Sequence, residues 1–514
     1  MWAMNLFNKR DCSIFCTKFP ACSMIAVAAG LAMSAQARAQ DVNLDPVKIV
    51  SDKLPEEMRP DSPRNPYRVE KTGQFGVEIF TQEDIQNLAP KDVFDLLTKA
   101  AGIDVTYQGR KSPFFVNERG GGNVTFIIDD AILPTTSNRI LQNIPLGAIE
   151  EIQIVRGSTA LAIGPSIPIG SSASGSGISS AFVIIRTKRP SETQAIVSTF
   201  AEQSPSEPVA NGQSAYLAKT FGKPKGDHAY VALSLSRMAR PSNDQTFDAE
   251  NGRSIMGSGG FSLGKLSANG MVYVDSGKFD MQRGVTVTGA LDPSEWYYDP
   301  IKTSVISADA TYAWTAHQTT IVQFFDTKYN QHEIDASFAN ATVTTRDFRE
   351  RNGGFSLRHN EQFGGTLVQL DHQVTSDEGF GPNLSNNYNN WKTRVSGWSA
   401  SVEQSLWKNA VTIDAGFRRD QKHIDYSATR ATALSADSNT DLAPAIIYTG
   451  GARWRISPKF ALNARYFHSN EGTTSNFGLT ALAGVTLLPE KQDWVEGGHR
   501  SQSAAATPTH RMIS

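Results

Sequence analysis

The feature that most constrains the fold is an alternation of apolar and polar side chains that recurs from about residue 191 onward. Residues 231–236 and 411–418 show it clearly, and residues 398–406 and 452–456 repeat it. A period of two predicts β-strands with one apolar face and one polar face. A sandwich would bury the apolar face against a second sheet, whereas a membrane barrel would turn it to lipid and line its lumen with polar groups.

Two further patterns favour the barrel. The predicted strands run for about ten residues, which is enough for a tilted strand to cross a bilayer. Tight turns such as residues 457–459 alternate with long polar connections such as residues 376–391, as expected of periplasmic turns and extracellular loops. We therefore expect a transmembrane antiparallel β-barrel.

The first 39 residues have the organisation of a secretory signal peptide. Lys9, Arg10 and Lys18 precede an apolar run at residues 24–33, and residues 37–39 form the small-x-small pattern of a cleavage site. The apolar run has half of the ~20 residues that a transmembrane helix needs. All three cysteines lie in this leader, so the mature chain, beginning near residue 40, has none for disulfides or thiolate chemistry.

Several classes of function find no support in the sequence. The formal net charge of −2 provides no basic surface for nucleic acid. The Ser-rich loop at residues 170–177 contains no Gly-x-Ser-x-Gly elbow, and no two histidines of the chain lie at metal-binding spacing. We expect no catalytic residue, no metal site and no cofactor, and a surface hydrolase remains an alternative for an activity assay to test.

The region before the alternating strands predicts a small α+β domain at residues 67–190. Thr81 is placed to cap a helix at residues 82–85, and a second helix restarts at Pro90. Its apolar face comprises Val93, Leu96, Leu97 and Ala100, and Gly102 is suited to end it in a left-handed conformation. We expect strands at residues 103–107, 124–129 and 152–155.

Four short motifs occur in this domain in the order and spacing of one known family. They are Leu96-Leu97 before Ala101-Gly102-Ile103, Glu118-Arg119-Gly120, Ile127 to Asp130 before Pro134, and Ile154-Val155-Arg156-Gly157. The domain resembles the plug of TonB-dependent outer-membrane receptors, and residues 446–496 resemble part of their barrel. This resemblance implies a TonB box and linker at residues 40–66, a plug at residues 67–190 and a partial barrel at residues 191–498.

The resemblance also implies partners and site residues. The TonB box, which would add a strand to the TonB energy-coupling protein, comprises Val47, Lys48, Ile49, Val50 and Ser51. Arg119 and Arg156 match plug arginines that pair with glutamates of the barrel. Glu496 matches one of those glutamates. The implied ligand is a ferric siderophore or a similar small molecule, and the implied surroundings are outer-membrane lipid.

Five aromatic residues fall in stretches that we expect to be long connections. They are Trp296, Tyr297, Tyr298, Tyr388 and Trp391. Their rings could stack on a catecholate or similar ligand, or they could belong to the aromatic girdle at the membrane interface.

The number of predicted strands is lower than the resemblance implies. About 14 candidate strands are present, whereas plugged outer-membrane transporters have about 22. A plug of this size is roughly 36 Å across, and a 14-stranded cylinder only about 28 Å. Residues 499–514 show no alternation, so we expect an aberrant tail on a truncated, incomplete barrel.

Two alternatives to an uptake receptor stay open. A nonfunctional receptor remnant would follow from an incomplete barrel, because unpaired strand edges are not stable in lipid. A signalling transducer is less favoured, because such receptors carry an extra domain before the TonB box and residues 40–45 leave no room for it.

Overall fold

The computed structural model describes residues 59, 62–110, 112–118, 122–133, 140–156, 163–165, 179–203, 209–223, 227–240, 249–281, 283–382, 388–428, 438–441, 443–457, 460–470, 491–497 and 499–502. The proposed signal peptide and TonB box lie outside these residues. Within them, no helix is both long and apolar enough to span a membrane.

The plug is built on a seven-stranded sheet with the order β1-β6-β7-β4-β3-β2, in which β5 pairs with β4. The strands are β1 (Val77–Thr81), β2 (Ile103–Arg110), β3 (Ser112–Glu118), β4 (Gly122–Ile128), β5 (Ala131–Leu133), β6 (Ile149–Arg156) and β7 (Ser179–Thr187). The β4–β7 pair is parallel and the other pairs are antiparallel. The strands predicted at residues 103–107, 124–129 and 152–155 are confirmed as β2, β4 and β6.

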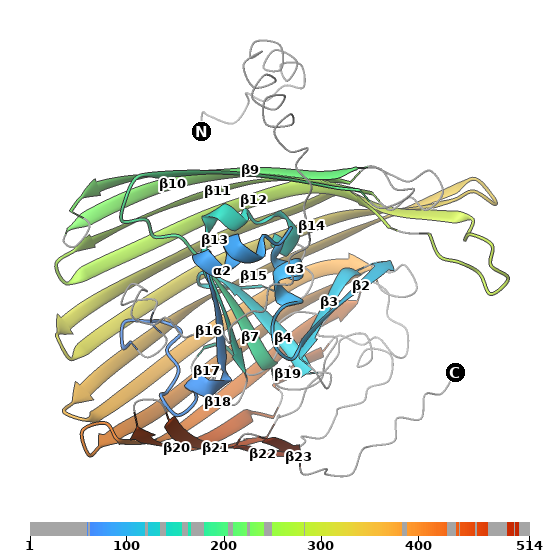
Figure 1. Cartoon of the computed structure of the whole chain (residues 1–514). Helices are drawn as coiled ribbons and strands as arrows, with labels where there is room; N and C mark the ends of the chain where they lie inside the picture. Colours follow the sequence, from blue (N-terminus) through green and yellow to red (C-terminus); the bar gives the residue numbers. More distant parts are fainter. Residues whose placement is uncertain are drawn as a thin grey trace, which may run out of the picture. The chain divides into compact units, whose positions relative to one another are not determined.

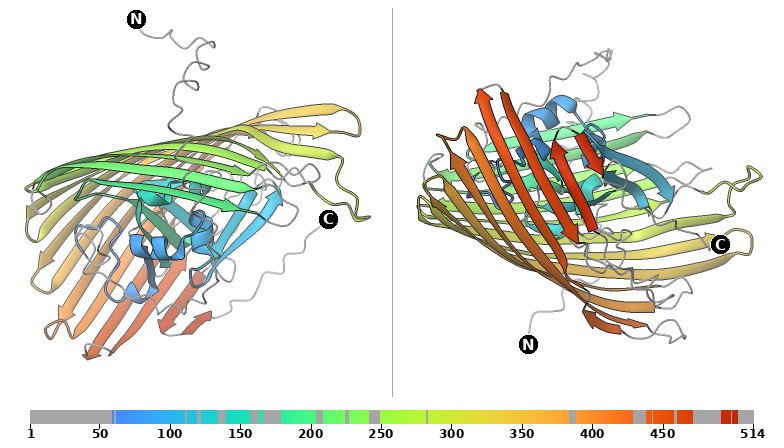
Figure 2. Two further views of the ribbon diagram at one scale, coloured as in Figure 1. Left: turned by 45° about the horizontal axis from the view of Figure 1, so that its top comes forward. Right: turned by 90° about the horizontal axis from the view of Figure 1, so that it is seen from below.

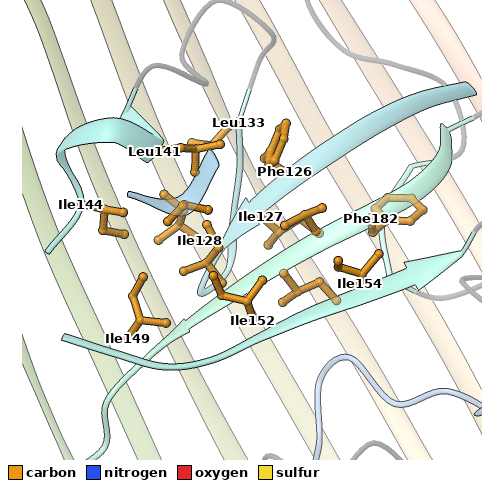
Figure 3. Packing of buried hydrophobic residues seen from close by; sticks show 14 of the residues in the cluster. Phe126, Ile127, Ile128, Leu133, Leu141, Ile144, Ile149, Ile152, Ile154 and Phe182 are labelled. Atoms are coloured by element: carbon orange, nitrogen blue, oxygen red, sulfur yellow. The ribbon is translucent and has the colours of Figure 1, made fainter. Parts of the chain in front are cut away.

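The core of the plug lies around the three central strands β4, β6 and β7 (Figure 3). Ile128, Ile152, Ile154 and Ile184 are fully buried. These strands are apolar at consecutive positions rather than at alternate ones, which is typical of strands covered on both faces. Most of this hydrophobic core belongs to the plug, and inward side chains of the large sheet such as Tyr273 and Phe325 extend it.

Short helices pack beside this sheet. They are η3 (Gln74–Gly76), α2 (Gln82–Leu88), α3 (Val93–Leu97), α4 (Ile140–Asn143) and η5 (Leu146–Ala148). The predicted cap is confirmed, because the Thr81 hydroxyl accepts from the Asp84 amide while the Asp84 carboxylate accepts from the Thr81 amide. α3 begins after Asp92 rather than at Pro90, because the Asp92 carboxylate caps the Asp95 amide at 2.8 Å. Gly102 has a φ of +70°, the expected left-handed conformation.

The rest of the described chain forms one antiparallel sheet of 16 strands, following chain order from β8 to β23, with β19 paired to β18 at its side. The strands are β8 (Gln194–Glu202), β9 (Ala210–Gly222), β10 (His228–Arg240), β11 (Ala249–Leu263), β12 (Leu266–Asp280), β13 (Ser294–Thr315), β14 (Gln318–Ser337), β15 (Thr342–Phe363), β16 (Thr366–Pro382), β17 (Tyr388–Leu406), β18 (Val411–Ala428), β19 (Ser438–Asp441), β20 (Ala445–Ser457), β21 (Phe460–Asn470), β22 (Lys491–Gly497) and β23 (His499–Gln502).

The sheet curves around the plug elements, which lie on its concave side (Figures 1 and 2). Among the described strands, β8 and β23 stand at the two ends of the hydrogen-bonded order and are not paired with each other. Residues 499–502 of the predicted tail form β23 and pair with β22, and the aberrant character of the tail stays a prediction. Residues 503–514 lie outside the described part.

The strands are longer than the expected ten residues. β13 and β15 have 22 residues each, and β14 has 20. Residues 376–391, predicted as a long connection, belong largely to β16 and β17, which pair up to Pro382 and Tyr388. The sequence shows no alternation of apolar and polar side chains in this stretch, because both faces of a strand become polar where it extends beyond the apolar band.

The two faces of the sheet have opposite chemistry. On the outer face Val231 is 55% exposed and Trp398 is 59% exposed, whereas the inward Ser234 and Glu403 are 1% and 3% exposed. A sandwich would bury the apolar face under a second sheet, and no such layer covers it within the described residues. The arrangement is therefore that of a barrel wall with an apolar outer surface.

Removing the cap of α2 provides a test of this local structure. Replacing Thr81 with Ala removes the hydroxyl that satisfies the Asp84 amide, so the helix should open more readily by about 1 kcal/mol. Hydrogen exchange of the α2 amides measures this opening. The exposed Gln86, replaced with Ala, is the control and should change it by a few tenths of a kcal/mol at most. Equal effects of the two substitutions would contradict the cap's contribution.

Candidate functional site: the contact between plug and sheet

The first part of the plug, residues 62–74, lies against the inner face of the large sheet. Arg68 Nη2 is 2.7 Å from Glu403 Oε2, and both side chains are almost fully buried. The same Glu403 accepts from the Lys71 amide at 2.8 Å and lies 3.5 Å from Lys71 Nζ. Glu403 thus receives three donors from one short plug segment.

A second buried cluster lies beside it and is centred on Arg465 of β21. Arg465 contacts Glu70 at 3.2 Å and Asp414 of β18 at 2.9 Å. It also donates to the Thr72 hydroxyl at 2.6 Å, and that hydroxyl donates to Asp414. Because one guanidinium bridges a plug carboxylate and a sheet carboxylate, neither unit satisfies this cluster alone.

Backbone groups of the same segment are also bound by the sheet. Asn360 Nδ2 donates to the Pro63 carbonyl at 2.6 Å, and Arg358 donates to the Pro66 carbonyl. Arg453 Nη1 donates to the Lys71 carbonyl at 3.4 Å. Proline lacks an amide but keeps a carbonyl, so a segment rich in proline still offers acceptors to the sheet. Residues 63–72 are therefore held by β15, β17, β18, β20 and β21.

A third contact is formed at the turn after β4 and at the end of β7. Arg189 Nη2 lies 2.7 Å from Asp309 of β13. Asp130 accepts from Gln323 of β14 and, at 3.2 Å, from the Tyr67 hydroxyl. Burial, together with the nearby carboxylates of Asp309 and Asp129, raises the pKa of Asp130 to about 8. Asp130 therefore carries a proton over much of the neutral pH range.

The helix α4 makes a fourth contact with the sheet. The Asn143 carbonyl accepts from the hydroxyls of Ser236 and Ser254, each at 2.8 Å. Asn143 Nδ2 donates to Asp275 at 3.3 Å. Small hydroxyl side chains on β10 and β11 allow this close approach. The plug is thus fixed from several directions by polar groups of the inner face.

The predicted latch of Arg119, Arg156 and Glu496 stays a prediction. Arg156 lies 3.3 Å from Glu78 and 4.0 Å from Glu118, both within the plug. Arg119 lies outside the described residues, and Glu496 is described only as a β22 residue whose backbone is paired with Arg465. The sheet carboxylates that bind the plug among the described residues include Glu403, Asp414, Asp309 and Asp275.

Sequence reasoning missed these contacts, although a weak signal existed. Glu403 and Asp414 occupy polar positions of alternating strands, which the barrel interpretation already turns inward. Arg68, Glu70 and Lys71 form a charged run at the start of the predicted plug, a few residues before its first strand. The pairing between the two sets depends on tertiary placement that no local pattern encodes.

The predicted aromatic ligand residues lie on strands, so their assignment to long connections is wrong. Trp296, Tyr297 and Tyr298 begin β13, and Trp391 belongs to β17. Tyr298 is buried in an aromatic and apolar cluster with neighbours on β12 and β14, against which Trp296 packs. Tyr388 is the first residue of β17, and nothing is described of its side chain.

This cluster lies on the inner face of the long strands, beyond the plug. Its rings come from adjacent strands: Phe348 is 6.0 Å from Tyr329 and 5.6 Å from Trp391, centroid to centroid. Trp391 Nε1 donates to the buried Asp377 at 2.8 Å. Tyr297 points away from the cluster, with Lys278 Nζ 4.6 Å from its ring centroid. Trp296, Tyr298 and Trp391 thus share one surface, and Tyr297 does not.

The described residues contain no group of three or more His, Cys, Asp and Glu side chains arranged to hold a metal ion.

Comparison with known proteins agrees with this arrangement. Residues 70–171 match the family model of the TonB-dependent receptor plug domain. No curated protein matches the chain.

Solved structures resemble the chain over most of its length. The alcaligin outer-membrane receptor FauA from Bordetella pertussis is 15% identical with a TM-score of 0.59, over 84% of this chain and 67% of that one. The ferric citrate transporter FecA is 13% identical with a TM-score of 0.62, over 82% and 66%. The ferric preacinetobactin receptor BauA from Acinetobacter baumannii is 12% identical with a TM-score of 0.60, over 82% and 67%. The chain spans about two thirds of the length of these structures.

An α+β plug bound to the polar inner face of a curved sheet with an apolar exterior defines the class of plugged outer-membrane receptors. The chain has the fold of the TonB-dependent receptors, and its residues 70–171 match the model of their plug domain. The solved structures that it resembles are receptors and transporters, not enzymes.

Breaking the Arg465 cluster should loosen the plug. Replacing Arg465 with Ala leaves Glu70 and Asp414 buried without their shared cation, at a cost of about 3–5 kcal/mol. Hydrogen exchange of the amides of residues 62–74 measures the opening free energy. The control is Lys91→Gln, which removes the half-exposed Lys91–Glu202 pair and should cost about 1 kcal/mol or less. Similar effects of the two substitutions would contradict the role of Arg465.

The raised pKa of Asp130 predicts a pH dependence. An unfolded aspartate has a pKa of about 3.9, so the folded plug binds the proton more tightly. The proton on Asp130 contributes fully to the free energy of unfolding below pH ~4. This contribution falls as the pH rises toward ~8, by at most about 1.4 kcal/mol per pH unit. Asp130→Asn should therefore flatten the pH dependence of the plug's unfolding temperature, measured by calorimetry. The control is the exposed Asp104 replaced with Asn. If Asp130→Asn kept the slope of the wild type, the raised pKa of Asp130 would be refuted.

Proposed function

We propose that the protein is an outer-membrane receptor that takes up a ferric siderophore or a similar small metal chelate, using energy delivered by the TonB protein. The apolar outer face of the sheet lies in the outer membrane. The plug blocks the lumen, and its displacement opens a path for the ligand. The protein makes and breaks no covalent bond.

The observation that carries this proposal is the position of the bound segment in the chain. Residues 63–72 follow the proposed TonB box at residues 47–51 by about a dozen residues. A pull on the box would reach Asn360, Arg358, Glu403 and Arg465 through this segment before it reached the core of the plug. The first bonds to break would be polar ones, which water can replace as they open.

The ligand side of the proposal rests on the inner aromatic surface. Trp296, Tyr298 and Trp391 lie together near the outer end of the long strands, and Phe348 lies between Trp391 and Tyr329. Aromatic faces bind flat, conjugated ligand groups, and this surface offers several of them side by side. The resembling structures are receptors or transporters for alcaligin, ferric citrate and ferric preacinetobactin, and this favours a ferric chelate as the ligand.

Uptake by cells that express the full chain tests the proposal. Deleting residues 47–51 should abolish uptake of radioactive iron presented as a ferric hydroxamate, catecholate or citrate, while surface binding of the same chelate remains. The matched control deletes residues 52–56, which shortens the same linker by the same length and keeps the box. It should retain most of the uptake, provided that the remaining linker spans the distance.

Two results would overturn the proposal. Equal uptake by both deletion variants and by the intact chain would exclude coupling through the box. Failure to recover any heat-modifiable protein from the outer membrane would favour the nonfunctional remnant instead.

A further inference from the structure

One aromatic ring of the inner surface is placed to meet a ligand directly. Among the described residues, three rings of this surface are buried by their neighbours: Tyr298, Tyr329 and Trp391. Trp296 and Phe348 are half-buried, so part of each ring is accessible. The guanidinium of Arg346 lies 5.9 Å from the Trp296 ring centroid and is itself held by Glu333 at 2.7 Å. One face of Trp296 is thus covered, which leaves Phe348 as the ring that a ligand can reach most directly.

The strand β15 carries both the plug contacts and Phe348, at different distances from the tight turn at its end. Asn360, Arg358 and Asn352 each donate to a carbonyl group of the plug. Phe348 is four residues beyond Asn352, or roughly 13 Å farther along the strand. The two side chains are an even number of residues apart, so they share the inner face of the sheet. A ligand that rests on the plug can therefore reach Phe348 without displacing these contacts.

Phe348 packs against Trp391 although the two residues are on strands that are not neighbours. Adjacent strands are about 4.8 Å apart, so β15 and β17 are separated by roughly 10 Å. The intervening strand β16 has glycines at the two inward positions between the rings, Gly379 and Gly381. A Cβ atom at Gly379 would overlap the Trp391 ring, and one at Gly381 would lie 2.7 Å from Phe348 Cδ2. The two rings can meet over β16, 5.6 Å apart, because these positions carry no side chain.

Asp377 fixes the orientation of the Trp391 ring. The indole nitrogen of Trp391 donates to Asp377 Oδ2 at 2.8 Å, and both side chains are buried. An indole has a single donor, and a hydrogen bond to a carboxylate is roughly twice as strong as one between neutral groups. The ring cannot turn without breaking this bond or striking the backbone at Gly379. Asp377 and Gly379 together therefore hold Trp391, and through it Phe348, in one position.

We propose that Phe348 contacts a planar aryl group of the ligand, and that Asp377 and Gly379 are positioning residues that set this contact through Trp391. Pairs of aromatic rings need a defined mutual geometry, whereas aliphatic groups pack on a ring in many orientations. A receptor with a fixed Phe348 therefore favours chelates whose iron-binding groups are aryl, such as catecholates and phenolates, over aliphatic hydroxamates. This inference rests on the proposed function and deepens it by naming the class of chelate.

Binding of two ferric chelates to the purified full chain in detergent tests the inference. One is a ferric tris-catecholate and the other a linear ferric trihydroxamate, and equilibrium dialysis with radioactive iron gives the dissociation constants. Asp377→Leu removes the acceptor of the Trp391 indole, and Gly379→Ala pushes the ring aside. Each substitution should raise the dissociation constant of the catecholate about fivefold, the size of one aromatic contact, and that of the hydroxamate less than about twofold.

Three further variants separate positioning from a general loss of structure. Asp377→Asn keeps an oxygen acceptor for the indole without the charge and should bind the catecholate like the unmodified chain. Gly257→Ala is the matched control, because an added Cβ in β11 meets no atom within 4 Å there, and it should leave both dissociation constants unchanged. In a chain that already carries Trp391→Ala, Gly379→Ala should have no additional effect, because the ring that it displaces is gone.

Fluorine NMR of the chain labelled with fluorotryptophan follows the position of the Trp391 ring independently of binding. The Trp391 signal, identified by its loss in Trp391→Phe, should shift in Asp377→Leu and Gly379→Ala and return in Asp377→Asn. The signals of the outward Trp314 and Trp398 should stay in place and show that the sheet is intact.

Several results would overturn the inference and leave the uptake proposal standing. They are an unmoved Trp391 signal in both variants, unchanged selectivity despite a moved signal, and equal weakening of both chelates. Binding by Asp377→Asn as weak as that by Asp377→Leu would also overturn it, because the effect would then belong to the carboxylate charge. If the unmodified chain binds neither class of chelate, the inference and the proposed function both fail.

Discussion

The polar side chains on the inner face of the large sheet must be satisfied, and this requirement shapes the rest of the structure. Most apolar side chains of the sheet face outward, and only a minority, such as Tyr273 and Phe325, join the hydrophobic core on its inner face. Charged residues such as Glu403, Asp414 and Arg465 face inward and are nearly inaccessible. A plug that supplied only apolar surface would leave them unpaired at a cost of several kcal/mol. The segment at residues 62–74 supplies matching charges and carbonyls instead.

Buried ion pairs such as these place the plug precisely and can still be broken when the plug is released. A buried ion pair gains little net stability over apolar packing, because the desolvation of both partners offsets their attraction. Loss of one partner is costly, whereas separation of both partners into water recovers their hydration. These contacts therefore define the position of the plug precisely, although each one opposes its displacement only moderately. Its own core, with Ile128, Ile152 and Ile154, stays apolar and need not open for the contact to break.

Much of the fold could be predicted because it depends on local patterns. The alternation at residues 231–236 and 411–418 determines which side chains face outward, and Thr81 and Gly102 mark helix ends through backbone chemistry. Strand length could not be predicted, because polar strand ends beyond the apolar band resemble loops. The ion pairs could not be predicted either, because Arg68 and Glu403 are 335 residues apart and meet only through tertiary structure. The same limit applies to Trp296 and Trp391, whose shared surface requires the pairing of several strands.

The order of the contacts along the chain matters for release more than their total strength does. The contacts of this segment follow one another along the chain: Pro63 binds Asn360, Pro66 binds Arg358, Arg68 and Lys71 share Glu403, and Glu70 binds Arg465. A pull from the N-terminal side therefore acts on them in series, as it would on a peeled strip. Only one or two contacts, each of a few kcal/mol, oppose the pull at any moment. The same contacts resist a displacement of the whole plug together, because all of them would then have to break at once. The segment can thus hold the plug firmly against thermal motion and still yield to a directed pull at its end.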